Sequence, residues 1–327
     1  MRRYFIYPSI GKYMANHKII ISVIIPFIKT NPYVEQCLNF LKKQSFKNFE
    51  IILLPDSATG PLGPAQKRDL AAKRANGEIL AFIDDDAYPS KDWLKSALDC
   101  FQEKDVAAVC GPGVTPPDDN IFQRSGGWVN SLWFGSGGAG TYRFIPQKRR
   151  LVDDYPSMNF LIRKTDFNSV GGFDTHFWPG EDTKLCLDLV YKLKKKIIYH
   201  PQVLVYHHRK PLFLPHLQQI SRFAVHRGHF ARILPATSLR FGYLIPTLFV
   251  MFVLFGYIIS LLYNPLLPVY LVIIVLYLCI LTANIVYVML KTGSILVSVL
   301  TGSGILLTHI LYGILFPYGY LKKSLKQ

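Results

Sequence analysis

The chain has 327 residues, which is enough for one α/β domain and a smaller second part. Its formal net charge of +16 suits a nucleic-acid binder or a protein on an anionic membrane surface; because the basic clusters flank an apolar region, we expect membrane lipids and no nucleic acid as partners. Five cysteines without C-x-x-C spacing argue against a disulfide framework and a zinc site, and they favour a reducing, cytoplasmic setting.

The chain begins with a basic and aromatic segment, residues 1–18, which lacks an apolar core long enough for a secretion signal. We expect a tail there, disordered or touching the membrane surface. Without a secretion signal, the domain that follows should stay in the cytoplasm.

From residue 19 onward, continuous apolar runs alternate with stretches of helical periodicity. We predict strands over Ile19–Pro26, Phe49–Leu54, Ile79–Ile83 and Val106–Cys110, and helices over Tyr33–Lys43, Ala65–Ala75 and Trp93–Phe101. Strands that alternate with helices predict an α/β fold with an open, mostly parallel sheet. Ligands bind such sheets beyond the carboxyl ends of the strands.

The following segments are less regular. We predict a loop over Gly126–Gly140, either flexible and near the site or passive on the surface. We also predict a strand over Phe160–Arg163, a helix over Glu181–Leu193 and a last strand over Ile197–Val205 that is broken by Pro201. Residues Pro215–Leu234 mix apolar side chains with arginine and histidine at helical spacing, which is typical of a helix that lies in a membrane interface.

The C-terminal part is strongly apolar: from Phe241 to Tyr320 the only charged residue is Lys291. Tyr243–Tyr263 and Leu266–Leu290 are each long enough to span the roughly 30 Å hydrocarbon core of a bilayer. The positive-inside rule then places the basic residues of Arg222–Arg240 in the cytoplasm.

A third apolar segment, Ser294–Phe316, has two interpretations. It is long enough to cross the membrane, but it contains three glycines and a histidine. A third crossing would leave Lys322, Lys323 and Lys326 outside, whereas a re-entrant segment would return them to the cytoplasm. The sequence leaves both open, so we expect two to three transmembrane helices.

Three aspartates, Asp84 to Asp86, follow directly after the strand predicted at Ile79–Ile83. Like charges this close repel one another unless a cation or hydrogen-bond donors compensate them. Asp84 and Asp86 are spaced to reach one hard cation, Mg²⁺ or Mn²⁺, while Asp85 points elsewhere, and such ions usually bring phosphate oxygens with them. The alternative is a solvated turn whose aspartates cap a helix.

The wider context of these aspartates resembles family 2 glycosyltransferases, which have the GT-A fold. The resemblance covers most of residues 19–210 in the family's order and spacing. It rests on Ser22–Pro26 (SVIIP), Phe49–Ser57 (FEIILLPDS), Lys67–Pro89 (KRDLAAKRANGEILAFIDDDAYP), Trp93-Leu94, Met158–Asp174 (MNFLIRKTDFNSVGGFD) and Pro179–Leu185 (PGEDTKL).

The resemblance implies roles for individual residues. Asp84 and Asp86 would hold the metal and the donor, and the donor-binding set would also include Pro26, Asp56, Arg68 and Asp85, with Arg68 near the diphosphate. Glu181-Asp182 matches the family's E-D pair, in which Asp182 is the general base for the acceptor hydroxyl. The alternative for this pair is simple capping of the following helix.

The sequence leaves the roles of two further residues, His207 and Arg222, open. His207 follows the last predicted strand, either as a third metal ligand or diphosphate contact or as a half-buried structural residue. Arg222 lies in Gln219–Phe223, which resembles the Q-x-x-R-W motif of membrane-bound polysaccharide synthases, but Phe223 replaces the tryptophan. Arg222 would contact either the donor diphosphate or lipid phosphates.

We therefore expect a multi-pass cell-membrane protein whose cytoplasmic GT-A domain transfers a sugar with inversion. The donor would be a nucleotide-sugar, and the acceptor a hydroxyl on a lipid-linked or amphiphilic molecule in glycolipid or cell-surface polysaccharide synthesis. A catalytically dead membrane-anchored scaffold is the alternative. The expected regions are a tail (1–18), the GT-A domain (19–211), an interface helix (212–240), a transmembrane region (241–320) and a basic tail (321–327).

Overall fold

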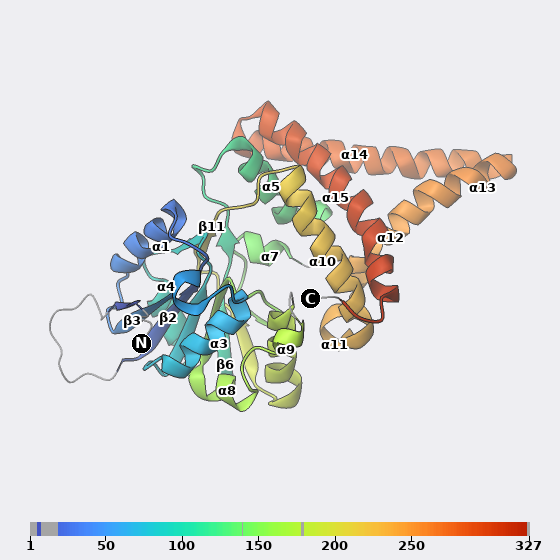
Figure 1. Cartoon of the computed structure of the whole chain (residues 1–327). Coiled ribbons are helices and arrows are strands. Elements are labelled where there is room, and N and C mark those ends of the chain that lie inside the picture. Colours follow the sequence, from blue (N-terminus) through green and yellow to red (C-terminus); the bar gives the residue numbers. More distant parts are fainter. Residues whose placement is uncertain (1–4, 8–18, 139, 178–179, 326–327) are drawn as a thin grey trace. The chain divides into compact units, whose positions relative to one another are not determined.

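The computed structural model describes residues 5–7, 19–138, 140–177 and 180–325, with only the backbone described for 5–7 and 175. Within these residues the chain forms two compact units, which Figure 1 traces along the sequence. The first unit consists of residues 5–114 and 145–207, and the second of residues 115–144 and 208–325. Each unit is described by itself below.

The first unit is built on an eight-stranded sheet of order β1-β3-β2-β4-β9-β6-β10-β8. Strands β2, β3, β4, β6 and β10 run in one direction, β9 runs against its neighbours β4 and β6, and β1 and β8 are antiparallel edge strands. The bounds are β1 Phe5–Tyr7, β2 Ile21–Pro26, β3 Phe49–Leu54, β4 Ile79–Ile83, β6 Val106–Cys110, β8 Arg150–Val152, β9 Asn159–Arg163 and β10 Lys196–Tyr199.

The central strands β2, β3 and β4 formed as predicted, because they are largely apolar runs buried along their whole length. The edge strands β1 and β8 were not predicted. The α-helices of this unit are α1 Pro32–Lys42, α2 Asp56–Thr59, α3 Pro64–Arg74, α4 Trp93–Cys100, α8 Lys164–Ser169 and α9 Glu181–Leu187, which continues as a π-helix over Asp188–Lys192. The side chain of Asn31 caps α1 by accepting from the backbone N–H of Tyr33 and Val34, which fixes where the helix begins.

A second, three-stranded sheet has the order β5-β11-β7, with β5 Ala87–Pro89, β7 Gly113–Val114 and β11 Val205–His207. The sequence predicts a last strand over Ile197–Val205 that is broken by Pro201, and the structure confirms the break. A turn in which the N–H of Val203 donates to the carbonyl of His200 ends β10, and the chain resumes as β11 in the other sheet.

The described part of the N-terminal tail is a strand. Residues 5–7 form β1, whose backbone pairs with β3, so this part of the expected tail joins the sheet. Residues 8–18 lie outside the described residues.

The second unit is helical. Its elements are α5 Ile121–Ser131, α6 Trp133–Ser136, α7 Thr141–Phe144, α10 Leu214–Ile233, α11 Pro235–Ser238, α12 Phe241–Met251, a π-helical segment Phe252–Gly256, α13 Tyr257–Leu262, a short 3₁₀ turn Asn264–Leu266, α14 Leu267–Thr292 and α15 Ile295–Leu321. Three stretches are long and apolar enough to cross a membrane: Phe241–Leu262, Asn264–Thr292 and Ile295–Leu321. They agree with the three apolar segments predicted from the sequence.

The loop predicted over Gly126–Gly140 is wrong, because α5 and α6 occupy most of it. Asn120 caps α5 by accepting from the N–H of Phe122 and Gln123. Gly127 is required for packing inside the helix, since a Cβ there would lie 2.2 Å from the hydroxyl of Thr115. Gly127 therefore indicates close packing of the helix against Thr115 and not a flexible chain. Val129 and Leu132 join a buried cluster with Leu212 and Ile305, which explains why residues 115–144 group with the C-terminal helices.

Candidate active site

The ends of three neighbouring strands bring the predicted donor-binding residues to one edge of the main sheet. β2 pairs in parallel with β3 and β4, with Pro26 opposite Leu54 and Ile24 opposite Phe82. Pro26, at the end of β2, Asp56, just past β3, and Asp84, just past β4, therefore lie at the same carboxyl edge. This is the edge at which α/β sheets bind ligands.

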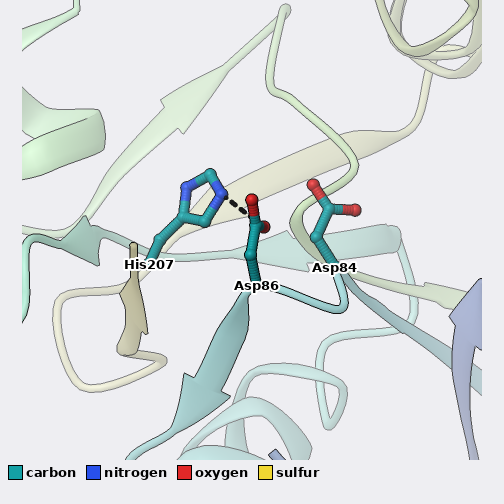
Figure 2. A group of neighbouring side chains, drawn as sticks. All are labelled: Asp84, Asp86 and His207. Carbon is teal, nitrogen blue, oxygen red and sulfur yellow. Dashed lines mark hydrogen bonds and ion pairs between the residues drawn. The ribbon is translucent and has the colours of Figure 1, made fainter. Parts of the chain in front are cut away.

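Asp84, Asp86 and His207 form a cluster in the first unit, and each can offer one ligand atom within 4.8 Å of the other two (Figure 2). The cluster follows from strand register. β5 begins directly after Asp86, and β11 pairs with it so that His207 is opposite Ala87. The imidazole Nε2 of His207 consequently lies 2.9 Å from Oδ1 of Asp86.

The donor set of this cluster fits a divalent ion. Two carboxylates supply hard oxygen ligands, and all three side chains are only partly buried. Asp85 lies beside the cluster, where Asn31 Nδ2 donates to its carboxylate at 3.5 Å. Burial, followed by repulsion from Asp86 and Asp84, raises the pKa of Asp85 to about 6, which marks a local excess of negative charge that a cation would relieve.

Arg68 connects the metal cluster to the start of α9. Its side chain projects from α3, is almost fully buried, donates to Oδ1 of Asp84 at 2.5 Å and lies 3.9 Å from Oε1 of Glu181. The guanidinium also lies 5.8 Å from the ring centre of Phe173. A buried charge needs such partners, because desolvation without compensation is costly. Arg68 thus links Asp84, predicted at the metal, to Glu181, the neighbour of the predicted base Asp182.

The Glu181-Asp182 pair opens α9 and its two side chains differ in exposure. Glu181 is buried and accepts from the N–H of Gly180 at 2.8 Å, while Asp182 is only partly buried and accepts from the N–H of Thr183 at 2.8 Å. The hydroxyl of Thr183 donates to the buried carboxylate of Asp154 at 2.8 Å. Both acids satisfy backbone donors at the helix start, and a chemical role for this pair stays a prediction.

Lys67 is a site residue that the sequence reasoning missed. It is almost fully buried, donates to the backbone carbonyl of Phe27 at 2.6 Å, and forms an ion pair with Asp56. The sequence did contain a signal for Lys67, because this residue precedes Arg68 in the K-R-D segment that resembles the family. Asp69, the third residue of that triplet, accepts from the N–H of Phe173 at 3.0 Å and thereby holds the ring that covers Arg68.

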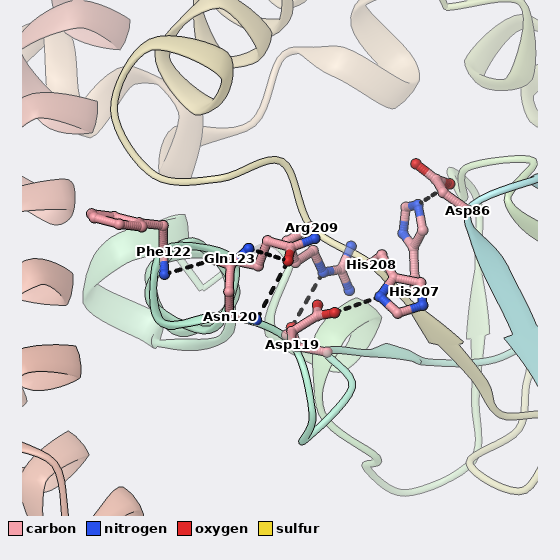
Figure 3. Close-up of polar contacts among 9 residues, drawn as sticks. Asp86, Asp119, Asn120, Phe122, Gln123, His207, His208 and Arg209 are labelled. Carbon is pink, nitrogen blue, oxygen red and sulfur yellow. Dashed lines mark hydrogen bonds and ion pairs between the residues drawn. The ribbon is translucent and has the colours of Figure 1, made fainter. Parts of the chain in front are cut away.

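His208 and Arg209, which follow His207 in the sequence, belong to the second unit and have other partners (Figure 3). The buried imidazole of His208 pairs through Nδ1 with Asp119, and Arg209 Nε donates to the hydroxyl of Thr115 at 3.3 Å. Of the two adjacent histidines, only His207 is part of the three-residue cluster described above.

Arg222 lies on α10 of the second unit. Its contact with a donor bound by the first unit therefore stays a prediction.

Residues 79–296, more than half of the chain, match the model of glycosyl transferase family group 2, and the chain belongs to this family. One relative is the pre-mycofactocin glycosyltransferase of Mycobacterium tuberculosis, 32% identical over 152 residues, which are 46% of this chain and 31% of the relative. Another is the poly(ribitol-phosphate) β-N-acetylglucosaminyltransferase TarS of Staphylococcus aureus, 30% identical over 120 residues, which are 28% of this chain and 21% of TarS.

The fold matches that of a solved structure, the mannosyltransferase PcManGT from Pyrobaculum calidifontis in complex with GDP-Man and Mn²⁺. The TM-score is 0.51 at 18% identity, and the match covers 96% of this chain and 90% of that one. The chain thus has a GT-A-type fold followed by apolar helices, as the sequence predicts.

Proposed function

We propose that the chain is a membrane-anchored inverting glycosyltransferase. It moves a sugar from a nucleotide-sugar to the hydroxyl of a lipid-linked or amphiphilic acceptor, in glycolipid or cell-surface polysaccharide synthesis. The observation that carries the proposal is the network in which Arg68 joins Asp84 of the metal cluster to Glu181, the neighbour of Asp182. This network supports a mechanism in which a cation and a base act close together, as transfer from a diphosphate donor requires.

Asp182 accepts the proton of the acceptor hydroxyl in this mechanism. The hydroxyl oxygen attacks the anomeric carbon while the bond from that carbon to the diphosphate oxygen breaks on the opposite face, so the configuration inverts. Arg68 binds the diphosphate and stabilises its growing charge. A divalent ion held by Asp84, Asp86 and His207 would neutralise further charge on the leaving diphosphate.

The ion is Mg²⁺ or Mn²⁺, and the donor set favours Mn²⁺. Mg²⁺ takes oxygen ligands, whereas mixed imidazole and carboxylate sets suit transition-metal ions. The fold shared with a mannosyltransferase that binds GDP-Man and Mn²⁺ supports this choice and a nucleoside diphosphate sugar as donor. Asp56, neutralised by Lys67, and Pro26 would line the nucleoside part of the site.

We place the catalytic unit on the cytoplasmic face of the cell membrane, because arginines precede the first candidate span, Phe241–Leu262. The competing function is a scaffold that binds the donor without transferring it. It would retain the metal cluster but release no nucleoside diphosphate.

Donor hydrolysis tests the proposal on the full chain in detergent. A panel of nucleotide-sugars is compared with Mn²⁺ and with EDTA, by thermal shift and by release of nucleoside diphosphate. We expect one donor class to raise the Tm and to be hydrolysed slowly in Mn²⁺ only. Stabilisation without any release, even with candidate lipid acceptors added, would favour the scaffold, and equal stabilisation in EDTA would contradict the metal site.

Arg68→Gln gives a prediction specific to this network. Arg68 neutralises Asp84 in the metal-free protein, so its removal should free that carboxylate and tighten binding of Mn²⁺ alone by roughly three- to tenfold, the effect of one competing charge screened about as strongly as in water. Binding of the donor in saturating Mn²⁺ should weaken, because the diphosphate loses its partner. Both affinities are measurable, by Mn²⁺ electron paramagnetic resonance and by calorimetry.

The matched control is Lys73→Gln, which removes the same charge from an exposed position on the same helix. Weaker Mn²⁺ binding in Arg68→Gln than in this control would show that Arg68 supports the metal site and does not compete with the ion.

A further inference from the structure

Helix α15 has one buried face made largely of small or polar residues and one exposed face made of large apolar residues. The buried face includes Ser298, Thr301, Gly302, Gly304, Thr308, Gly313 and Gly319, and the exposed face includes Leu296, Val299, Leu307, Ile310, Ile314, Tyr318 and Leu321. Apolar side chains point outward, so this helix is built to contact lipid along one side. A span at the edge of a bundle and a helix lying along the membrane surface would both have this pattern.

The neighbour of the C-terminal half of α15 is α10. The imidazole of His216 lies 3.2 Å from the hydroxyl of Thr308 at one end of the contact, and His229 Nδ1 lies 3.0 Å from the carbonyl of Lys322 at the other. Between these points the backbones touch, because a Cβ on Gly319 would lie 2.0 Å from the carbonyl of Val225. The two helices therefore run side by side and in the same direction over most of α10.

α10 itself is unfit for hydrocarbon. Its 20 residues include Arg222, Arg227 and Arg232, together with three histidines. An arginine at the centre of a membrane helix costs about 2.5–3.5 kcal/mol on insertion scales. A helix that lies along α10 for this distance must share its depth, so the C-terminal half of α15 is held at the membrane surface and not in the bilayer core.

The other contacts of α15 lead to the same arrangement. The N-terminal half of α15 packs on α5, where the hydroxyl of Ser125 donates to the carbonyl of Val297 at 3.4 Å. It meets α12 near the start of that helix, since a Cβ on Gly313 would lie 2.4 Å from the carbonyl of Pro246. It meets α14 in two places: a Cβ on Gly302 would lie 2.5 Å from the side chain of Ile285, and Nδ1 of His309 lies 3.0 Å from the hydroxyl of Tyr277.

These contacts place α15 across the base of a helical hairpin. The chain passes from α10 into α12, turns at Asn264–Leu266, and returns through α14 to α15. In Figure 1, α13 and α14 meet at the end of the hairpin away from α15. The contacts at Pro246 and Ile285 lie toward the ends that adjoin α10 and α15 in the chain, whereas the contact with Tyr277 lies near the middle of α14.

We propose that α15 does not cross the membrane. It lies in the membrane surface with α10, its exposed apolar face dips into the acyl chains, and the lysines that follow it contact anionic headgroups. The chain then crosses twice, through Phe241–Leu262 and Asn264–Thr292, and its C-terminal tail is on the same side as α10. At 27 residues, or about 40 Å of helix, α15 forms a long lipid-binding bar.

Single-cysteine labelling of the full chain tests this proposal independently of transfer activity. Exposed Cys279 is first replaced by alanine, and the buried cysteines are kept. Three reporters are then introduced at exposed positions: Gln218→Cys on α10, Asn264→Cys in the hairpin turn and Ser324→Cys after α15. Each is treated with a membrane-impermeant maleimide in spheroplasts and in inverted vesicles.

We expect Ser324→Cys to be labelled from the same side as Gln218→Cys, and Asn264→Cys from the opposite side. A detergent-solubilised sample shows that each thiol is reactive. If Ser324→Cys shares the side of Asn264→Cys, α15 crosses the membrane and the proposal is overturned.

Discussion

The Asp86→Asn variant should lose Mn²⁺-dependent donor binding and all measurable transfer. Asp86 supplies one carboxylate of the metal cluster and holds the imidazole of His207 at 2.9 Å, so the substitution removes a charged ligand and weakens the orientation of another. Loss of a residue that only orients a metal ligand typically costs 10–100-fold in metal affinity, and loss of a charged ligand should cost at least as much. We expect the Kd of Mn²⁺ to rise by at least roughly 100-fold, measured by electron paramagnetic resonance.

The control for this variant is Asp105→Asn. Asp105 is an exposed carboxylate just before β6, at the amino end of that strand, where it pairs with Lys196. The Asp105→Asn variant should have almost the same Mn²⁺ affinity and activity as the wild type. Wild-type Mn²⁺ affinity in Asp86→Asn would exclude this residue as a ligand, whatever the effect on transfer.

The Asp182→Asn variant should lose transfer while keeping its donor. Asparagine preserves the shape of the side chain, and its Oδ1 can still accept from the N–H of Thr183, so the start of α9 should remain folded. It cannot take a proton at neutral pH. A general base contributes typically 10²–10⁴-fold, and we expect kcat to fall by about that factor. The donor Kd should shift by less than roughly tenfold, because the base acts chiefly in the transition state.

Glu181→Gln is the comparison for that experiment. Glu181 is buried and lies 3.9 Å from Arg68, so its substitution should disturb the position of Arg68 and weaken donor binding as well as turnover. If Asp182→Asn instead lost donor binding while acceptor-saturated turnover stayed high, Asp182 would be a donor ligand and Glu181 the first candidate for the base.

Much of the first unit could be predicted from the sequence because its signals are local. β2, β3 and β4 are short apolar runs ended by proline or aspartate, and α1, α3 and α4 have helical periodicity between them. Parallel strands end at one edge, so the placement of Asp56 and of Asp84 to Asp86 followed from the order of elements. The three apolar helices were likewise visible in composition alone.

The helical segment at Gly126–Gly140 could not be predicted, because the fit of its glycines depends on neighbours outside the segment. A glycine pattern looks the same whether the chain is flexible or tightly packed, and the Thr115 side chain against Gly127 decides between the two. The break at Pro201 in Ile197–Val205 was visible in the sequence, but the sequence did not predict that the second part joins another sheet.

The sequence and the tertiary structure each determine part of the candidate site. By itself the sequence determined which carboxylates stand at strand ends and that the C-terminal part suits a membrane. Only the tertiary structure decided that His207 meets Asp86, because the register of β11 on β5 is a long-range pairing, and that Arg68 reaches both Asp84 and Glu181. It also decided the neighbours of α15, since hydropathy measures how apolar a helix is, whereas its depth in a membrane depends on what packs beside it.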